Sequence, residues 1–187
     1  MSLDQLFRSN RTIQKFEKST ISKDEIVKAI EYALLAPNHR YTFPWKYILV
    51  GQDCLGQLLI VVKSLKEKKL QRPLFADELL NIEAKFKNPA ALLVCLRERA
   101  DTELQEKEDY ASVACAIQNL SLFLTSIGYG TKWGSGGITR DSRTYELLGV
   151  DILKYEIEAF LWVGKTVAGS LKPRRRPFVT DVLVEIP

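Results

Sequence analysis

The sequence is poor in the residues on which metal sites and nucleophilic catalysis most often depend. It holds a single histidine, His39, and three cysteines, none of which forms a Cys-x-x-Cys pair. An odd number of cysteines without paired spacing, two of them in apolar surroundings, is typical of reduced, buried thiols. The sequence also offers no Ser-His-Asp arrangement. We therefore expect no metal site and no catalytic nucleophile.

Long apolar runs and a strong charge of either sign are missing as well. No run reaches the ~18 consecutive apolar residues expected of a membrane helix, and residues 1–5 lack the charged-then-apolar order of a signal peptide. The net charge of +4 is compatible with an anionic cofactor or substrate but is too weak to indicate nucleic-acid binding. We expect a soluble, cytoplasmic protein with no membrane partner and no nucleic-acid partner.

The remaining composition is that of an ordinary globular protein, with 46% hydrophobic and 27% charged residues. A chain of 187 residues is long enough for one domain with a sizeable core, so we expect a single domain over residues 1–187. In residues 71–88 the apolar positions lose their regular spacing, which favours a mobile lid with short helices. Residues 178–187 alternate weakly, which predicts a terminal strand or an arm laid on a partner subunit.

Helical periodicity and capping signals predict five helices. Ser22 and Glu25 form a capping box before a helix that ends at Pro37. The other helices are expected over residues 3–8, 54–69, 109–127 and 141–148. The helix over residues 109–127 is apolar nearly all round, so it is expected either in the core or at the centre of an obligate dimer.

Apolar runs predict strands over residues 46–50, 89–96 and 156–164. The run over residues 89–96 is continuous, which is typical of a strand buried on both faces. Residues 97–108 are dense in charge and poor in apolar side chains. This composition predicts a surface loop.

Residues 36–45 connect the first long helix to the first strand. Pro37 and Pro44 fix φ and remove backbone donors, so neither a helix nor a central strand continues through them. His39 and Tyr41 stand between the two prolines. Such a stiff connection either holds a flat ligand or caps the core with its aromatic rings, and both interpretations remain open.

Residues 8–16 place cations among hydroxyl and amide groups. Arg11 and Lys15 supply charge, and Thr12 supplies a hydroxyl. Phosphate binding requires this mixture, because cations neutralise the charge while hydroxyl and backbone N–H groups donate aimed hydrogen bonds. A solvated basic surface would show the same composition.

Residues 128–137 contain five glycines, which either let the backbone approach a ligand closely or form tight turns. Gly128 is well placed as the residue that ends the preceding helix. The segment is not a dinucleotide-binding fingerprint, because it lacks the third glycine and follows a helix instead of a strand. It is not a P-loop either, because no Gly-Lys-Ser/Thr closes it.

Three of these segments occur together in the nitroreductase family of flavoproteins, which the sequence resembles, particularly in its small members. Residues 10–16 resemble the signature Arg-Arg-Ser-x-Arg-x-Phe, with Asn10 in place of the first cation and Thr12 in place of serine. Residues 36–45 resemble Ala-Pro-Ser...Gln-Pro-Trp, with Phe43 in place of glutamine. Gln118-Asn119-Leu120, followed by residues 128–133, resembles the family's helix and Gly-Leu-Gly segment.

The resemblance implies an α+β fold with a central, mostly antiparallel sheet flanked by helices, in an intertwined homodimer with FMN at the subunit interface. By this resemblance, one subunit would contact the flavin phosphate and ribityl chain through Asn10, Arg11, Thr12 and Lys15. The other subunit would approach the flavin with Pro37, Asn38, His39 and Tyr41. Lys132, Trp133 and Gly134 would face the isoalloxazine ring. The phosphate site would be completed by Arg174, Arg175 or Arg176.

The function implied by the resemblance is that of an FMN-dependent NAD(P)H oxidoreductase. It would reduce nitroaromatic, quinone or related small-molecule acceptors by ping-pong hydride transfer through flavin N5, so that the flavin and not a side chain carries the chemistry. A flavin-binding sensor or carrier with little turnover is the alternative. A nucleic-acid binder using the basic residues 63–69 and 174–176 is disfavoured, because the aromatic residues lie in apolar runs and not among the cations.

Overall fold

A sheet of four antiparallel strands in the order β1-β2-β4-β3 forms the centre of the molecule. The strands are β1 (Trp45–Leu49), β2 (Ala91–Glu98), β3 (Gly130–Gly134) and β4 (Tyr155–Gly164). The structure, a computed structural model, describes residues 1–171 and 176–186. The expected α+β architecture around an antiparallel sheet is confirmed. Three strands match the predicted apolar runs, and β3 comes from the glycine-rich segment.

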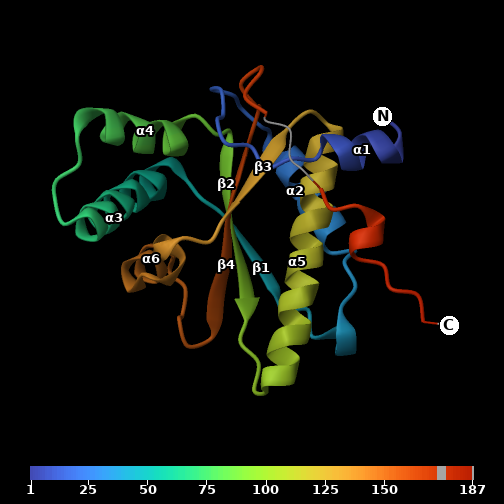
Figure 1. Ribbon diagram of the computed structural model, residues 1–187. Coiled ribbons are helices and arrows are strands. Elements are labelled where there is room, and N and C mark those ends of the chain that lie inside the picture. Colours follow the sequence, from blue (N-terminus) through green and yellow to red (C-terminus); the bar gives the residue numbers. More distant parts are fainter. Residues whose placement is uncertain (172–175, 187) are drawn as a thin grey trace.

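Helices cover both faces of the sheet (Figure 1). On one face lie α3 (Gln52–Leu70), α4 (Ala76–Lys87) and α6 (Ser142–Leu148). On the other face lie α2 (Lys23–Ala33) and α5 (Glu103–Ser126), and α1 (Leu3–Ser9) packs beside α5. The molecule therefore has three layers, with the sheet in the middle. No helix in the described part of the chain is both long and apolar enough to cross a membrane.

Strand β2 is buried on both faces, as its continuous apolar run predicts. Leu92 and Val94 pack with α3 and α4, whereas Leu93 and Cys95 pack with α2 and α5. The alternation follows from the two-residue period of a strand. Burial also raises the pKa of the Cys95 thiol, which fits a reduced core cysteine.

Local capping signals are confirmed where the sequence predicts them. Ser22 Oγ accepts a hydrogen bond from Glu25 N at 3.1 Å, and Glu25 Oε2 accepts one from Ser22 N at 2.9 Å. Gly128 follows the C-cap of α5 with φ of +88°, a conformation that favours glycine. These contacts join residues that are close together in the sequence, so they can form without contacts from the rest of the fold.

The predicted surface loop over residues 97–108 is wrong. Arg97 belongs to β2 and is only 5% exposed, and α5 begins at Glu103 after the N-cap Thr102. The Arg97 guanidinium pairs with three carboxylates, those of Glu106, Glu156 and Glu158. The charges of this segment suggest solvent exposure when only the sequence is read, but Arg97 and Glu106 form ion pairs that join β2, β4 and α5.

Two further segments differ from their expected local structure. Residues 76–87 form one continuous twelve-residue helix, α4, anchored by buried Ile82 and Phe86, in place of several short helices. Within residues 176–186 there is no strand; a single 3-10 turn spans Val179–Asp181, and its neighbours are exposed. Mobility of the lid and docking of the arm on a partner remain predictions.

Candidate functional site

The N-terminal segment that carries the basic and hydroxyl residues lies along the edge strand β3. Ile13 N donates to Thr131 O at 2.9 Å, and Thr12 forms a parallel bridge with Thr131. A Cβ atom on Gly130 would lie 2.2 Å from Ile13 Cγ1, so only glycine permits this approach. The glycine-rich strand therefore fixes the position of residues 11–16 beside the sheet.

A cavity of about 450 Å³ lies between this segment, α4 and the sheet, and we call it the α4 cavity. Its apolar walls include the rings of Phe16, Phe86 and Trp162. Amide side chains and cations complete the lining: Gln14, Asn81, Asn88, Lys15, Lys85 and Lys132. Aromatic walls with a few convergent polar groups are typical of small-molecule sites, which span ~300–1,000 Å³.

The α4 cavity is positively charged. Lys132 on β3 is half-buried, and its pKa is lowered first by burial and then by the nearby charge of Lys85. Within residues 1–171 and 176–186, no carboxylate forms an ion pair with Lys15, Lys85 or Lys132. Cations held together without a counter-ion favour an anionic or electron-rich ligand.

A second hollow of about 590 Å³ adjoins the α4 cavity, and we call it the Arg11 hollow. The two spaces share Gln14 and Lys15 in their linings. The other lining groups of the hollow include Arg11, Thr12 and Ser170. Arg11 is half-buried and donates one guanidinium hydrogen bond to Asn10 O at 2.8 Å. Two cations and the Thr12 hydroxyl thus converge as a phosphate requires.

The donor set fits a flat heteroaromatic group joined to a phosphate, as FMN is. Aromatic rings and amides line the space for a ring system, and lysines stand where negative charge on it would be stabilised. Arg11, Lys15 and hydroxyl groups line the adjoining space for a phosphate. Four of the expected residues, Arg11, Thr12, Lys15 and Lys132, are brought together by the fold.

Asn10 lies outside this arrangement. Its side-chain amide donates to Thr125 Oγ1 at 2.9 Å and to Ser121 O at 3.3 Å, both on α5. The side chain therefore joins the N-terminal segment to α5 and does not line the Arg11 hollow. Its expected contact with a phosphate finds no support in this placement.

Neighbouring residues on β3 face opposite sides of the sheet. Lys132 lies opposite Trp162 on the side of the α4 cavity, and Gly134 is close to the indole of Trp162. Trp133 lies opposite Leu161, and its Nε1 donates to Glu158 O at 3.2 Å. Trp133 is thus turned away from the cavity that Lys132 lines.

The proline-bounded loop is held by buried polar groups at the start of α5. The Asn38 amide donates to Thr42 Oγ1 at 3.0 Å and to Ser112 Oγ at 3.3 Å, and Thr42 Oγ1 donates to buried Asp109 at 2.5 Å. Arg40, Tyr41 and Phe43 have φ between +48° and +59°, which is strained for residues with a side chain. His39, Tyr41 and Pro37 are exposed, and His39 Nε2 lies 3.9 Å from Glu108 Oε1.

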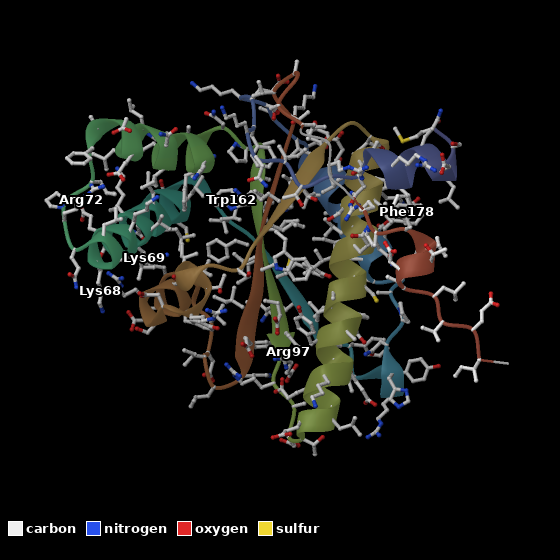
Figure 2. All side chains as sticks on the ribbon, viewed as in Figure 1. Lys68, Lys69, Arg72, Arg97, Trp162 and Phe178 are labelled. Carbon is white, nitrogen blue, oxygen red and sulfur yellow. The ribbon has the colours of Figure 1, made fainter. Side chains whose placement is uncertain are left out.

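A single chain does not bring this loop to the α4 cavity. Trp45, which follows the loop, lies opposite Arg97, and Arg97 lies opposite Glu156 on β4. Lys132 of the α4 cavity lies opposite Trp162 on the same strand β4. Six residues of β4 separate the two levels, a distance of about 20 Å along a strand. Figure 2 shows Arg97 and Trp162 toward opposite ends of the sheet. Arg174 and Arg175 lie outside the described residues, and Arg176 is exposed.

Four polar residues of the cavity were not among the sequence candidates: Gln14, Asn81, Lys85 and Asn88. Asn81 and Lys85 are four residues apart, so they share one face of α4. That spacing is a usable signal, but only once residues 76–87 are assigned to a helix. Gln14 lies inside the family-like segment and alternates with the buried Ile13.

Comparisons with known proteins give one consistent result. The family model described as Nitroreductase family matches residues 7–165. A curated relative, "Putative NAD(P)H nitroreductase YfhC" of Bacillus subtilis (strain 168), is 33% identical over 153 residues, which cover 79% of this chain and 76% of the relative.

Solved structures show the same fold. A nitroreductase-like family protein from Bacillus cereus superposes with a TM-score of 0.84 at 23% identity, covering 100% of this chain and 96% of the other. A point mutant of the FMN and NADPH-dependent nitroreductase NfnB from sphigopyxis sp. strain HMH superposes with a TM-score of 0.82 at 13% identity, covering 99% of each chain. The expected nitroreductase-like architecture is therefore confirmed.

Proposed function

Because this chain belongs to the nitroreductase family, we propose that it is an FMN-dependent oxidoreductase that uses NADH or NADPH to reduce nitroaromatic, quinone or related acceptors. One observation carries the proposal: an aromatic-walled cavity faced by Lys15, Lys85 and Lys132 adjoins a hollow that also contains Arg11. The names of the relatives support the choice of FMN and of a nicotinamide donor.

In this proposal the side chains bind and orient, and the cofactor supplies the redox chemistry. When bound, FMN exchanges a hydride equivalent at its N5 atom. Arg11 and Lys15 hold the phosphate, with Thr12 as a hydroxyl donor. Lys132 and Lys85 stabilise negative charge on the reduced ring, and Phe86 and Trp162 exclude water from its edge.

No acid, base or nucleophile of this chain is assigned to the reaction. The donor and the acceptor use the same open space in turn, which gives ping-pong kinetics. We expect a broad range of flat acceptors, because the apolar rings of the lining discriminate weakly between flat molecules of similar size.

We also propose that two copies of the chain complete two such sites. The strained loop with His39 and Tyr41 lies about 20 Å from the α4 cavity of its own chain, so it would serve the cavity of a second chain. The C-terminal segment supports association because its apolar side chains are exposed without cover in one copy: Phe178, Val179, Val182, Leu183, Val184 and Ile186. The small side chains Ala111 and Cys115 on the exposed face of α5 would allow a close helix approach.

An anaerobic titration tests the proposed activity. The purified protein, loaded with FMN, should lose its flavin absorbance on addition of NADH or NADPH, and a nitroaromatic or quinone acceptor should restore it. A protein that binds FMN but bleaches with neither donor would be a flavin carrier or sensor, which contradicts the proposed turnover.

A further inference from the structure

A second cavity, which we call the α3 cavity, lies behind one wall of the α4 cavity. Its volume is about 340 Å³, and it is bounded by the starts of α2 and α3, the end of β1 and the start of β2. Phe86 and Trp162 line both cavities. Their rings meet edge to face, with centroids 4.8 Å apart at an angle of 70°.

The register of the sheet explains this division. Val50 N donates to Leu92 O at 3.0 Å, Leu92 lies opposite Trp162, and Trp162 lies opposite Lys132. These four residues form one row across the strands, which are ~4.8 Å apart. The Trp162 indole stands in the middle of the row. Val50 and Leu92 line the α3 cavity on one side, and Lys132 lines the α4 cavity on the other.

Most of the residues that line the α3 cavity are apolar. Aliphatic side chains and the two aromatic rings make up this apolar part; the aliphatic ones include Ile26, Leu49, Leu55 and Leu92. The volume is at the lower end of the ~300–1,000 Å³ range for small-molecule sites, which suits one or two rings. Transfer of a flat apolar molecule from water into such an interior is favourable in free energy.

The polar side chains of the lining, those of Ser22, Lys23 and Gln52, belong to the starts of α2 and α3, and we call this part of the cavity its mouth. The Ser22 hydroxyl already donates to Glu25 Oε2 at 2.8 Å, which leaves Lys23 and Gln52 as side-chain donors. Glycine at the N-cap of α3 has no side chain to cap the helix, and in residues 1–171 and 176–186 no other side chain accepts a hydrogen bond from its first N–H groups, so these are available as donors. Carboxylates stand in the first turns of the same helices: Asp24, Glu25 and Asp53. The Lys23 charge therefore does not stand alone at this end of the cavity. The mouth therefore suits a neutral oxygen acceptor better than an anion.

We propose that the α3 cavity binds a neutral aromatic molecule of one or two rings, whose single carbonyl-type oxygen accepts hydrogen bonds at the Lys23–Gln52 mouth. This site is separate from the α4 cavity and does not depend on the proposed redox function. A molecule in the α3 cavity would contact one side of the Phe86–Trp162 pair, and a molecule in the α4 cavity would contact the other side.

The test uses 1-indanone, a neutral two-ring aryl ketone, with the purified full-length protein in its FMN-loaded state. Its binding is measured by isothermal titration and by saturation-transfer NMR. Two substitutions fill the α3 cavity: Ala90→Leu from its wall and Gly51→Leu from its mouth, where an added Cβ meets nothing within 4 Å and φ is −76°. Ala84→Leu is the matched control, because Ala84 lines only the α4 cavity.

We expect 1-indanone to bind the wild type saturably. It should bind at least about tenfold more weakly to a filled variant that keeps the wild-type thermal melt. Its binding to Ala84→Leu should be unchanged. Three results would overturn the proposal: no saturable binding to the wild type, wild-type affinity in both filled variants, or loss of binding in Ala84→Leu. The last result would place the ketone in the α4 cavity. The flavin absorbance of each sample reads FMN retention separately, so failure of the proposed cofactor would not be mistaken for failure of this site.

Discussion

Lys132 links the electrostatics of the cavity to its proposed ligand at the scale of a single residue. Burial and the charge of Lys85 lower its pKa, because both disfavour the charged form of this side chain in the unliganded fold. A lysine whose folded pKa lies below its unfolded value destabilises the fold at neutral pH, and the penalty falls as pH rises through the folded pKa. The same charge becomes favourable when an electron-rich ligand enters.

We therefore predict opposite effects of Lys132→Met on stability and on binding. Without FMN, the variant should melt at or above the wild-type temperature at pH 7, because a buried charge is removed. Its affinity for FMN should fall. The FMN affinity of the wild type should also decline as the pH rises. The decline should begin at a lower pH than the titration of an ordinary lysine would produce. Differential scanning fluorimetry and flavin fluorescence titration measure both effects; lower apo stability together with unchanged affinity would contradict the assignment.

Arg11 tests the phosphate part of the site. Arg11→Ala removes a charge-assisted hydrogen bond, which contributes ~1.5–3 kcal/mol. We expect FMN binding to weaken by about 10- to 150-fold in a fluorescence titration. Arg8→Ala is the control, because Arg8 is exposed and pairs with Asp4 within α1. Equal affinities of the two variants would place the phosphate elsewhere.

At the scale of elements, Arg97 joins two strands to the long helix. It is nearly buried and pairs with Glu106 on α5 and with Glu156 and Glu158 on β4. Burial raises the pKa of Glu158, whereas its bond to Arg97 opposes that shift. Removal of the arginine would leave Glu106 and Glu158 without their counter-ion, and Glu156 with Arg99 alone.

Arg97→Ala should lower the free energy of unfolding by about 3 kcal/mol, the lower end for breaking a buried ion pair, because Glu156 keeps partial solvent access. Arg99→Ala, which removes an exposed partner of Glu156, should cost less than ~1 kcal/mol. Urea unfolding measures both values. Equal and small losses in the two variants would show that the Arg97 cluster does not stabilise the junction between β2, β4 and α5.

The sequence allowed prediction of those elements whose signals are local. The Ser22–Glu25 capping box and the continuous apolar run of β2 depend on neighbours in the chain, and both are confirmed. The surface loop expected over residues 97–108 is wrong because Arg97 belongs to β2 and pairs with Glu156 and Glu158, distant partners on β4. The glycine-rich segment becomes strand β3 because it pairs with β4, a contact that residue types alone do not specify.

The candidate site could be predicted to the same limited extent. Arg11, Lys15 and Lys132 carry chemistry that is visible in their residue types and in the family-like motifs. Asn81 and Lys85 were missed because their common face exists only on a regular α4. The direction of Asn10 could not be foreseen, since its partners Ser121 and Thr125 lie more than 100 positions away on α5.

At the scale of the whole molecule, one chain holds the parts of the proposed site at two ends of its sheet. The loop with three strained residues would have little purpose as an isolated surface, since such strain persists mainly where function requires it. Pairing of two chains would bring each loop to a cavity of the other chain and would cover the apolar C-terminal segment.

We expect a dimer in solution that a bulky side chain on the exposed face of α5 disrupts. Ala111→Trp should shift the mass in light scattering from two chains toward one, and it should reduce FMN retention, because each site would lose its partner loop. Ala76→Trp is the control, since Ala76 is exposed at the start of α4 away from that face. A wild-type protein that is monomeric, yet retains FMN, would contradict the shared site.

A crystal structure of the protein grown with FMN would show where the flavin binds. We expect the flavin ring in the α4 cavity between Lys132 and the Phe86–Trp162 pair, with its phosphate beside Arg11 and Lys15. A structure in which FMN is absent at saturating concentration, or bound on a surface remote from these residues, would contradict this expectation.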